Sequence, residues 1–231
     1  MSLHSDGLNE SPVNPLPATV MILVLIMTVV EGAFALGARG IIGGPEAVGW
    51  RLNAIQDYAF STHAVIWMVE TGTLRGDFLI RFVTYPFLHS GFTHFIFAAV
   101  MMLALGKFVG ERMGQVALII LFFGSCFIGA CVFTIMAPDA GVLIGAFPGV
   151  YGLIGGFTCL FWLRLGEVGA QQGQAFTLIG LLLGIQLVFG LLFGGGPDWI
   201  ADLGGFVAGF FLSFLLLPGA LIRLRDKLRR N

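Results

Sequence analysis

Long apolar runs, separated by short polar breaks, account for most of this chain. Six of them approach the roughly 20 residues that a helix needs to cross the hydrocarbon core of a bilayer. Only helices and closed barrels satisfy all backbone polar groups in lipid. The pattern therefore predicts an all-α membrane protein, a bundle of six transmembrane helices. The predicted spans are 19–36, 87–108, 115–136, 149–165, 176–193 and 199–217.

Composition supports lipid as the solvent of this chain. Charged residues make up 11% and hydrophobic residues 57% of the 231 positions, whereas a soluble domain carries about 25% charged residues. So few charges cannot cover a surface that faces water. The net charge of −1 provides no basic field, so we expect no nucleic-acid partner. The expected surroundings are lipid and the transmembrane helices of other proteins.

The segment between the first two runs differs from the rest. Residues 38–85 contain four arginines and four acidic residues, and their amphipathic pieces are too short to cross a bilayer. We expect a long first loop that lies in the membrane interface. The predicted organisation is a disordered cytoplasmic tail over 1–18, one membrane domain over 19–217 and a basic cytoplasmic tail over 218–231.

Basic residues in the short loops predict the orientation of the spans. With both termini inside, the cytoplasmic side holds Lys107, Arg112, Arg164 and the five basic residues of the tail. The outer loops 137–148 and 194–198 hold none. We therefore expect a multi-pass protein with both termini in the cytoplasm. Because no transit peptide is recognisable, the expected location is a bacterial cytoplasmic membrane.

Three stretches rich in glycine or polar residues lie at the predicted outer ends of alternate spans. They cover 87–98, 145–156 and 201–209, so they can face one another in the bundle. Glycines four positions apart lie on one helix face and allow close helix crossings in lipid. We expect the fourth and sixth spans to pack through such faces, formed by Gly152, Gly156, Gly205 and Gly209.

Ionisable residues at membrane depth are the candidates for chemistry. On one helix, His89 and His94 would lie about 140° apart, which is a poor spacing for a metal pair. We therefore expect no metal site and no cofactor, and hydrogen-bonding roles for both histidines. Asp202 has two interpretations: it caps the start of the sixth helix, or it has a polar partner in a cavity, such as His94. Glu31 must be neutral or have a polar partner, which the sequence does not identify.

These stretches, in this order, resemble the rhomboid family of intramembrane serine proteases. The resemblance runs from about residue 75 to 217. His89-x4-His94, with Arg81 before it, is similar to the family's second-helix signature. The segment that begins at Gly145 and includes Tyr151 resembles the turn that carries the nucleophile. Residues 201–209 resemble the sixth helix, where the family has a catalytic histidine.

The chain departs from the family at the positions that would carry the reaction. The resemblance places Phe147 at the nucleophilic serine, Asp202 at the catalytic histidine and Ala98 at an oxyanion-hole asparagine. His94 corresponds to a family residue near the oxyanion hole, and Tyr151 to one that stacks beside the catalytic histidine. Because phenylalanine has no nucleophilic atom, the resemblance implies a catalytically degenerate member.

Several functions follow from a retained scaffold with an altered site. The favoured hypothesis is a rhomboid pseudoprotease that binds transmembrane segments and affects their assembly, stability or degradation. A fixed structural subunit of a larger membrane complex would use the same helix faces. A serine endopeptidase with a non-standard site would need a hydroxyl other than one at position 147. A transporter is disfavoured because the chain has no internal repeat.

Overall fold

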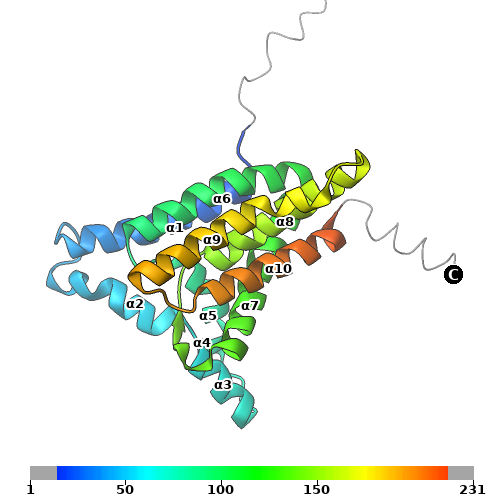
Figure 1. Cartoon of the computed structure of the whole chain (residues 1–231). Helices are drawn as coiled ribbons and strands as arrows, with labels where there is room; N and C mark the ends of the chain where they lie inside the picture. Colours follow the sequence, from blue (N-terminus) through cyan, green and yellow to red (C-terminus); the bar gives the residue numbers. More distant parts are fainter. Residues whose placement is uncertain (1–14, 218–231) are drawn as a thin grey trace, which may run out of the picture.

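The computed structural model describes residues 15–217 (Figure 1). Six of its helices are long and apolar enough to cross a membrane, which confirms the predicted all-α architecture with six spans. The predicted tails over 1–18 and 218–231 lie outside the described residues, apart from 15–18. The long helices are α1 (Ala18–Ala38), α6 (Phe92–Met113), α7 (Gln115–Met136), α8 (Phe147–Glu167), α9 (Thr177–Phe193) and α10 (Trp199–Leu216).

Two predicted helix boundaries were wrong. The second span was expected over 87–108, but α6 covers Phe92–Met113, because Gly91 is extended and Gly114 ends the helix with a φ of 90°. Its last turn therefore includes Arg112, which was expected to lie beyond the helix. The fourth span begins at Phe147 instead of Gly149, because Pro148 fits the first turn of a helix, where no backbone N–H is needed.

The first loop is folded rather than irregular. It contains a short strand, β1 (Phe60–Ser61), which pairs antiparallel with β2 (Val142–Leu143) in the connection between α7 and α8. Thr62 strengthens this junction, since its hydroxyl donates to the Pro138 carbonyl over 2.8 Å. The loop helices are η1 (Pro45–Gly49), α2 (Trp50–Tyr58), α3 (Thr62–Thr71), α4 (Gly76–Leu79), α5 (Arg81–Thr84) and η2 (Tyr85–Phe87), while η3 (Pro138–Ala140) and η4 (Gln172–Phe176) lie in later connections.

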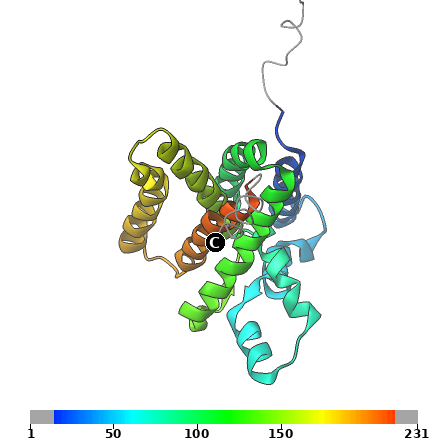
Figure 2. The same ribbon diagram turned by 90° about the vertical axis from the view of Figure 1, so that its right-hand side faces the viewer.

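Helix α8 forms the centre of the bundle and packs against α6, α7 and α10. Of the most apolar 18-residue stretch of α8, 61% of the residues are buried, against 12% for the fifth span, which contains α9. Figure 2 shows α9, in yellow to orange, at the edge of the bundle. The bundle is therefore a close-packed group of helices with one loosely attached member.

Candidate functional site

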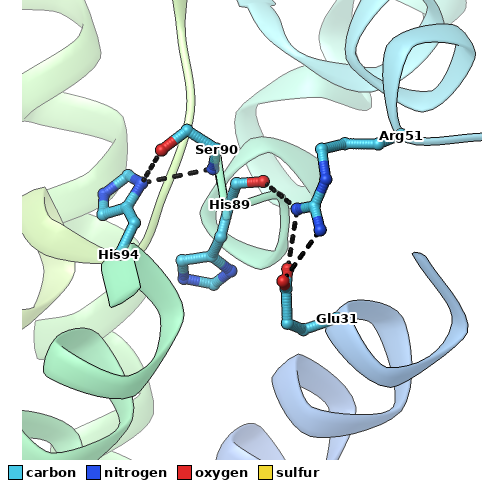
Figure 3. A network of polar contacts seen from close by, with 5 residues as sticks. All are labelled: Glu31, Arg51, His89, Ser90 and His94. Carbon is cyan, nitrogen blue, oxygen red and sulfur yellow. Dashed lines mark hydrogen bonds and ion pairs between the residues drawn. The ribbon is translucent and has the colours of Figure 1, made fainter. Parts of the chain in front are cut away.

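An ion pair joins α1 to the first loop beneath the first predicted site stretch (Figure 3). Glu31, on α1, is only 3% exposed. Both of its carboxylate oxygens accept from the Arg51 guanidinium on α2, over 2.8 Å each. Arg51 also donates to the backbone carbonyl of His89. Arg51 is thus the polar partner of Glu31 that the sequence left open, and it holds the backbone that enters α6.

His89 lies in an extended segment before α6, not on the helix. The expected separation of about 140° between His89 and His94 on one helix was therefore wrong. The two rings meet edge to face with centroids 5.3 Å apart. Within residues 15–217, neither ring nitrogen of His89 has a hydrogen-bond partner. Burial, followed by the charges of His94 and Arg51, lowers the pKa of His89 to about 4, so its ring is neutral at pH 7.

His94 lies in the first turn of α6 and has two close neighbours. Its Nδ1 accepts the Ser90 N–H over 3.3 Å and lies 3.1 Å from the Ser90 hydroxyl (Figure 3). Its ring stacks on Phe147, with centroids 5.1 Å apart and an interplanar angle of 9°. Phe147 therefore occupies the space above His94 with an apolar ring.

Gly145 holds the other side of the His94 ring. Its φ is 98°, and a Cβ at this position would lie 2.7 Å from His94 Cε1. The Gly145 N–H donates to the Tyr85 carbonyl over 3.0 Å, which ties the turn before α8 to the segment before α6. Any side chain here would strain the backbone and displace His94.

Asp202 lies on α10 and is 4% exposed. Its Oδ2 accepts a 2.9 Å hydrogen bond from the Gln186 amide on α9. The expectation that Asp202 caps its helix was wrong, because Asp198 occupies the N-cap position. Asp202 does have a polar partner, but that partner is Gln186 and not His94. The sequence analysis missed Gln186, although a lone amide in an apolar span is a recognisable signal, since polar groups are expensive in lipid.

Ala98 and Tyr151 complete the set of expected site residues. Ala98, one turn after His94 on α6, is fully buried, and Tyr151 on α8 is 4% exposed. The methyl group of Ala98 has no hydrogen to donate to an oxyanion. Around His94, the structure therefore offers one hydroxyl at hydrogen-bonding distance, that of Ser90, and an aromatic ring at the position where the resemblance expects a nucleophile.

The expected packing glycines lie where α8, α10 and α7 approach one another. A Cβ at Gly205 would collide with the Pro148 carbonyl, and one at Gly209 with the Gly152 carbonyl. Gly152 faces the Ser125 side chain of α7, and a Cβ added at Gly156 would lie 3.2 Å from the Ser213 hydroxyl. These contacts bring the turn at the start of α8 against α10 and so set the depth of Phe147 in the bundle.

Comparison with known proteins agrees with this architecture. Rhomboid-like protease 3 of Toxoplasma gondii is 30% identical over 137 residues, which cover 58% of this chain and 50% of that protein. YdcA of Bacillus subtilis, which carries a rhomboid protease name, is 24% identical over 164 residues, 68% of this chain and 80% of YdcA. Inactive rhomboid protein 1 of Danio rerio is 28% identical over 137 residues, 57% of this chain and 15% of that protein.

The chain thus spans half or less of the Toxoplasma and Danio proteins, whose remaining segments have no counterpart in these matches. Residues 77–219 match the rhomboid domain, a range that contains His94, the turn before α8 and Asp202. This multi-pass membrane protein therefore belongs to the rhomboid family.

Proposed function

We propose that this chain is a rhomboid pseudoprotease that binds transmembrane segments of other membrane proteins and affects their assembly, stability or degradation. The observation that carries the proposal is the stack of Phe147 on His94. It fills the position of the expected serine with a ring that cannot attack a peptide carbonyl. Loss of the nucleophile reduces the rate by about 10⁶ in a measured hydrolase.

Two further positions support the proposal. Removal of one oxyanion donor lowers the rate about 10²–10³-fold, and Ala98 has no group to donate. The side chain of Asp202 accepts a hydrogen bond from Gln186. Its carboxylate is therefore bound to α9 and not to the turn that carries Phe147. Three separate positions thus lack the atoms, or the partners, that peptide hydrolysis would need.

A cleft between α9 and α10 is the proposed docking surface. It has a volume of about 720 Å³ and apolar walls that include Leu183, Leu191, Trp199 and Leu203. Because helix α9 is weakly packed, it leaves this cleft open to the side of the bundle. An apolar client helix could enter sideways from the lipid and pack against α10 without passing through water.

The relatives' names include both proteases and an inactive protein. We propose that this chain is inactive because of its own residues at positions 147, 98 and 202, and not because of the names of its relatives. We further propose that it resides in a bacterial cytoplasmic membrane with both termini in the cytoplasm. That orientation rests on the basic residues of the short loops.

The test uses the purified chain, a fluorophosphonate probe and a model rhomboid substrate, with an active rhomboid as the positive control. We expect neither labelling nor cleavage. A photo-crosslinking residue at Leu191 or Leu203, facing the cleft, should capture the substrate, whereas one at Ile135 on the exposed face of α7 should not. Cleavage by the pure chain, or equal capture at both places, would contradict the proposal.

A specific observation favours a second candidate, a serine hydrolase with a non-standard site. The Ser90 hydroxyl lies 3.1 Å from His94 Nδ1, which is within reach for a nucleophile and its base. Ser90 is exposed, so a substrate could approach it. This candidate predicts fluorophosphonate labelling of the native chain that Ser90→Ala abolishes and Ser125→Ala does not. Our primary proposal predicts no labelling of any of the three.

A further inference from the structure

A second groove lies where α6, α8 and α10 end, at the other end of α6 from His94. Its volume is about 810 Å³. Its walls include the apolar side chains of Phe108, Leu160, Phe161 and Phe214, and three charged residues, Arg112, Arg164 and Glu167, line it as well. A groove with an apolar wall and cationic groups suits an amphiphile with an anionic end.

The two arginines differ in how they are engaged. Arg112 lies over the Phe108 ring, 5.3 Å from its centroid, and has no carboxylate partner within residues 15–217. Arg164 pairs with Glu167 over 3.0 Å, but the two side chains are 71% and 66% exposed. An ion pair this exposed is weak, so Arg164 can exchange its carboxylate for another anion.

Guanidinium groups match the oxygens of a phosphate, to which they can donate two parallel hydrogen bonds. Basic residues near a bilayer surface attract anionic lipids by about 1 kcal/mol each.

We propose that this groove binds an anionic phospholipid, with its phosphodiester between Arg112 and Arg164 and an acyl chain along the phenylalanines. We commit to a lipid rather than a free phosphate because the groove lies at the ends of three membrane-spanning helices and most of its lining side chains are apolar. The lipid would hold together the ends of α6, α8 and α10. This site is separate from the cleft proposed for client helices.

Native mass spectrometry of the full chain, titrated with phosphatidylglycerol, tests the proposal. We expect tighter binding than for phosphatidylcholine of equal chain length. Arg112→Gln and Arg164→Gln should each weaken phosphatidylglycerol binding about fivefold, which corresponds to about 1 kcal/mol. The double lysine variant, Arg112→Lys with Arg164→Lys, should keep most of the affinity. Because both positions face solvent, these variants should fold.

Arg75→Gln is the matched control, since it breaks another exposed arginine–carboxylate pair, with Asp77, in the first loop. It should leave lipid binding unchanged. Equal affinity for the two lipids would overturn the proposal. So would undiminished binding in Arg112→Gln combined with Arg164→Gln, because the basic tail would then hold the lipid. Soluble glycerophosphoglycerol binding as tightly as the lipid would show an anion site and overturn the lipid assignment.

Discussion

Helices α8 and α9 both belong to predicted membrane spans, and the span that contains α9 is the more apolar, with a mean hydropathy of 2.3 against 1.3, yet α9 is the less buried of the two. Gly152 on α8 lies against the Ser125 side chain of α7, and Gly155 lies against the backbone of α10, so a Cβ at either position would collide with its neighbour. On α9, a Cβ added at Gly180, Gly184 or Gly190 would meet no atom of another element within 4 Å. A glycine in a membrane helix therefore indicates close packing only where a partner surface is present.

The difference separates two tasks within one fold. The contact of α8 with α10 holds the turn that carries Phe147, and the ion pair of Glu31 with Arg51 holds the backbone that enters α6. Helix α9, held to α10 by a hydrogen bond between side chains, leaves a lateral cleft. Movement of α9 would therefore change the cleft with little effect on the stack of Phe147 and His94.

Gly209→Leu should destabilise the close packing of α8 against α10. A side chain there would meet the Gly152 carbonyl, which belongs to the backbone and cannot rotate away. We expect the free energy of unfolding to fall by about 3 kcal/mol or more. The matched variant Gly184→Leu on α9 should change it by less than about 0.5 kcal/mol. Unfolding in mixed micelles measures both, and equal losses would remove the distinction between the two helices.

Arg51→Leu should destabilise the close-packed half by about 3 kcal/mol, because it leaves the buried Glu31 carboxylate without its partner. Arg75→Leu breaks an exposed pair and should lose at most about 1 kcal/mol. The double variant Glu31→Leu with Arg51→Leu should recover much of the loss, since no unpaired charge remains. If the double variant is no more stable than Arg51→Leu, the ion-pair explanation fails.

Low pH should lower the free energy of unfolding through the protonation of His89. Its pKa is about 4 in the folded chain and about 6.5 when unfolded, so the unfolded state binds more protons between these values. Stability is therefore complete above pH 6.5 and falls as the pH drops towards 4. Between pH 7 and pH 5 the loss should be about 2 kcal/mol. His89→Phe should make stability nearly independent of pH between about pH 7 and pH 5. If the slope is unchanged in this variant, another group causes the loss of stability.

Gln186→Leu should produce the smallest change in stability and the largest in the position of α9. The variant removes the 2.9 Å hydrogen bond to Asp202, and such bonds between membrane helices contribute about 1 kcal/mol. Spin labels on α9 and α10 should report a broader distance distribution. Gln174→Leu, at an exposed position before α9, should leave the distribution unchanged. A narrow distribution in Gln186→Leu would mean that other contacts hold α9.

The sequence by itself determined the membrane class, the number of spans and the stretches 87–98 and 145–156 that meet at His94. Hydropathy over about 20 residues depends on the bilayer and not on neighbouring helices, so the bounds 115–136 matched α7. Boundaries set by local backbone geometry were less predictable. Gly91 and Pro148 moved the starts of α6 and α8 by a few residues, and the pairing of β1 with β2 joins segments about 80 residues apart.

Only the tertiary structure decided the partners of the polar residues. Glu31 and Arg51 are 20 residues apart, Gln186 and Asp202 are 16 apart, and each pair joins two helices. Helical periodicity relates residues within one helix, whereas such pairs depend on how two helices cross. For the same reason the sequence could list the glycines of α8 and α9 but not distinguish them. A glycine becomes a packing site only when another helix lies against it, and that depends on the arrangement of the whole bundle.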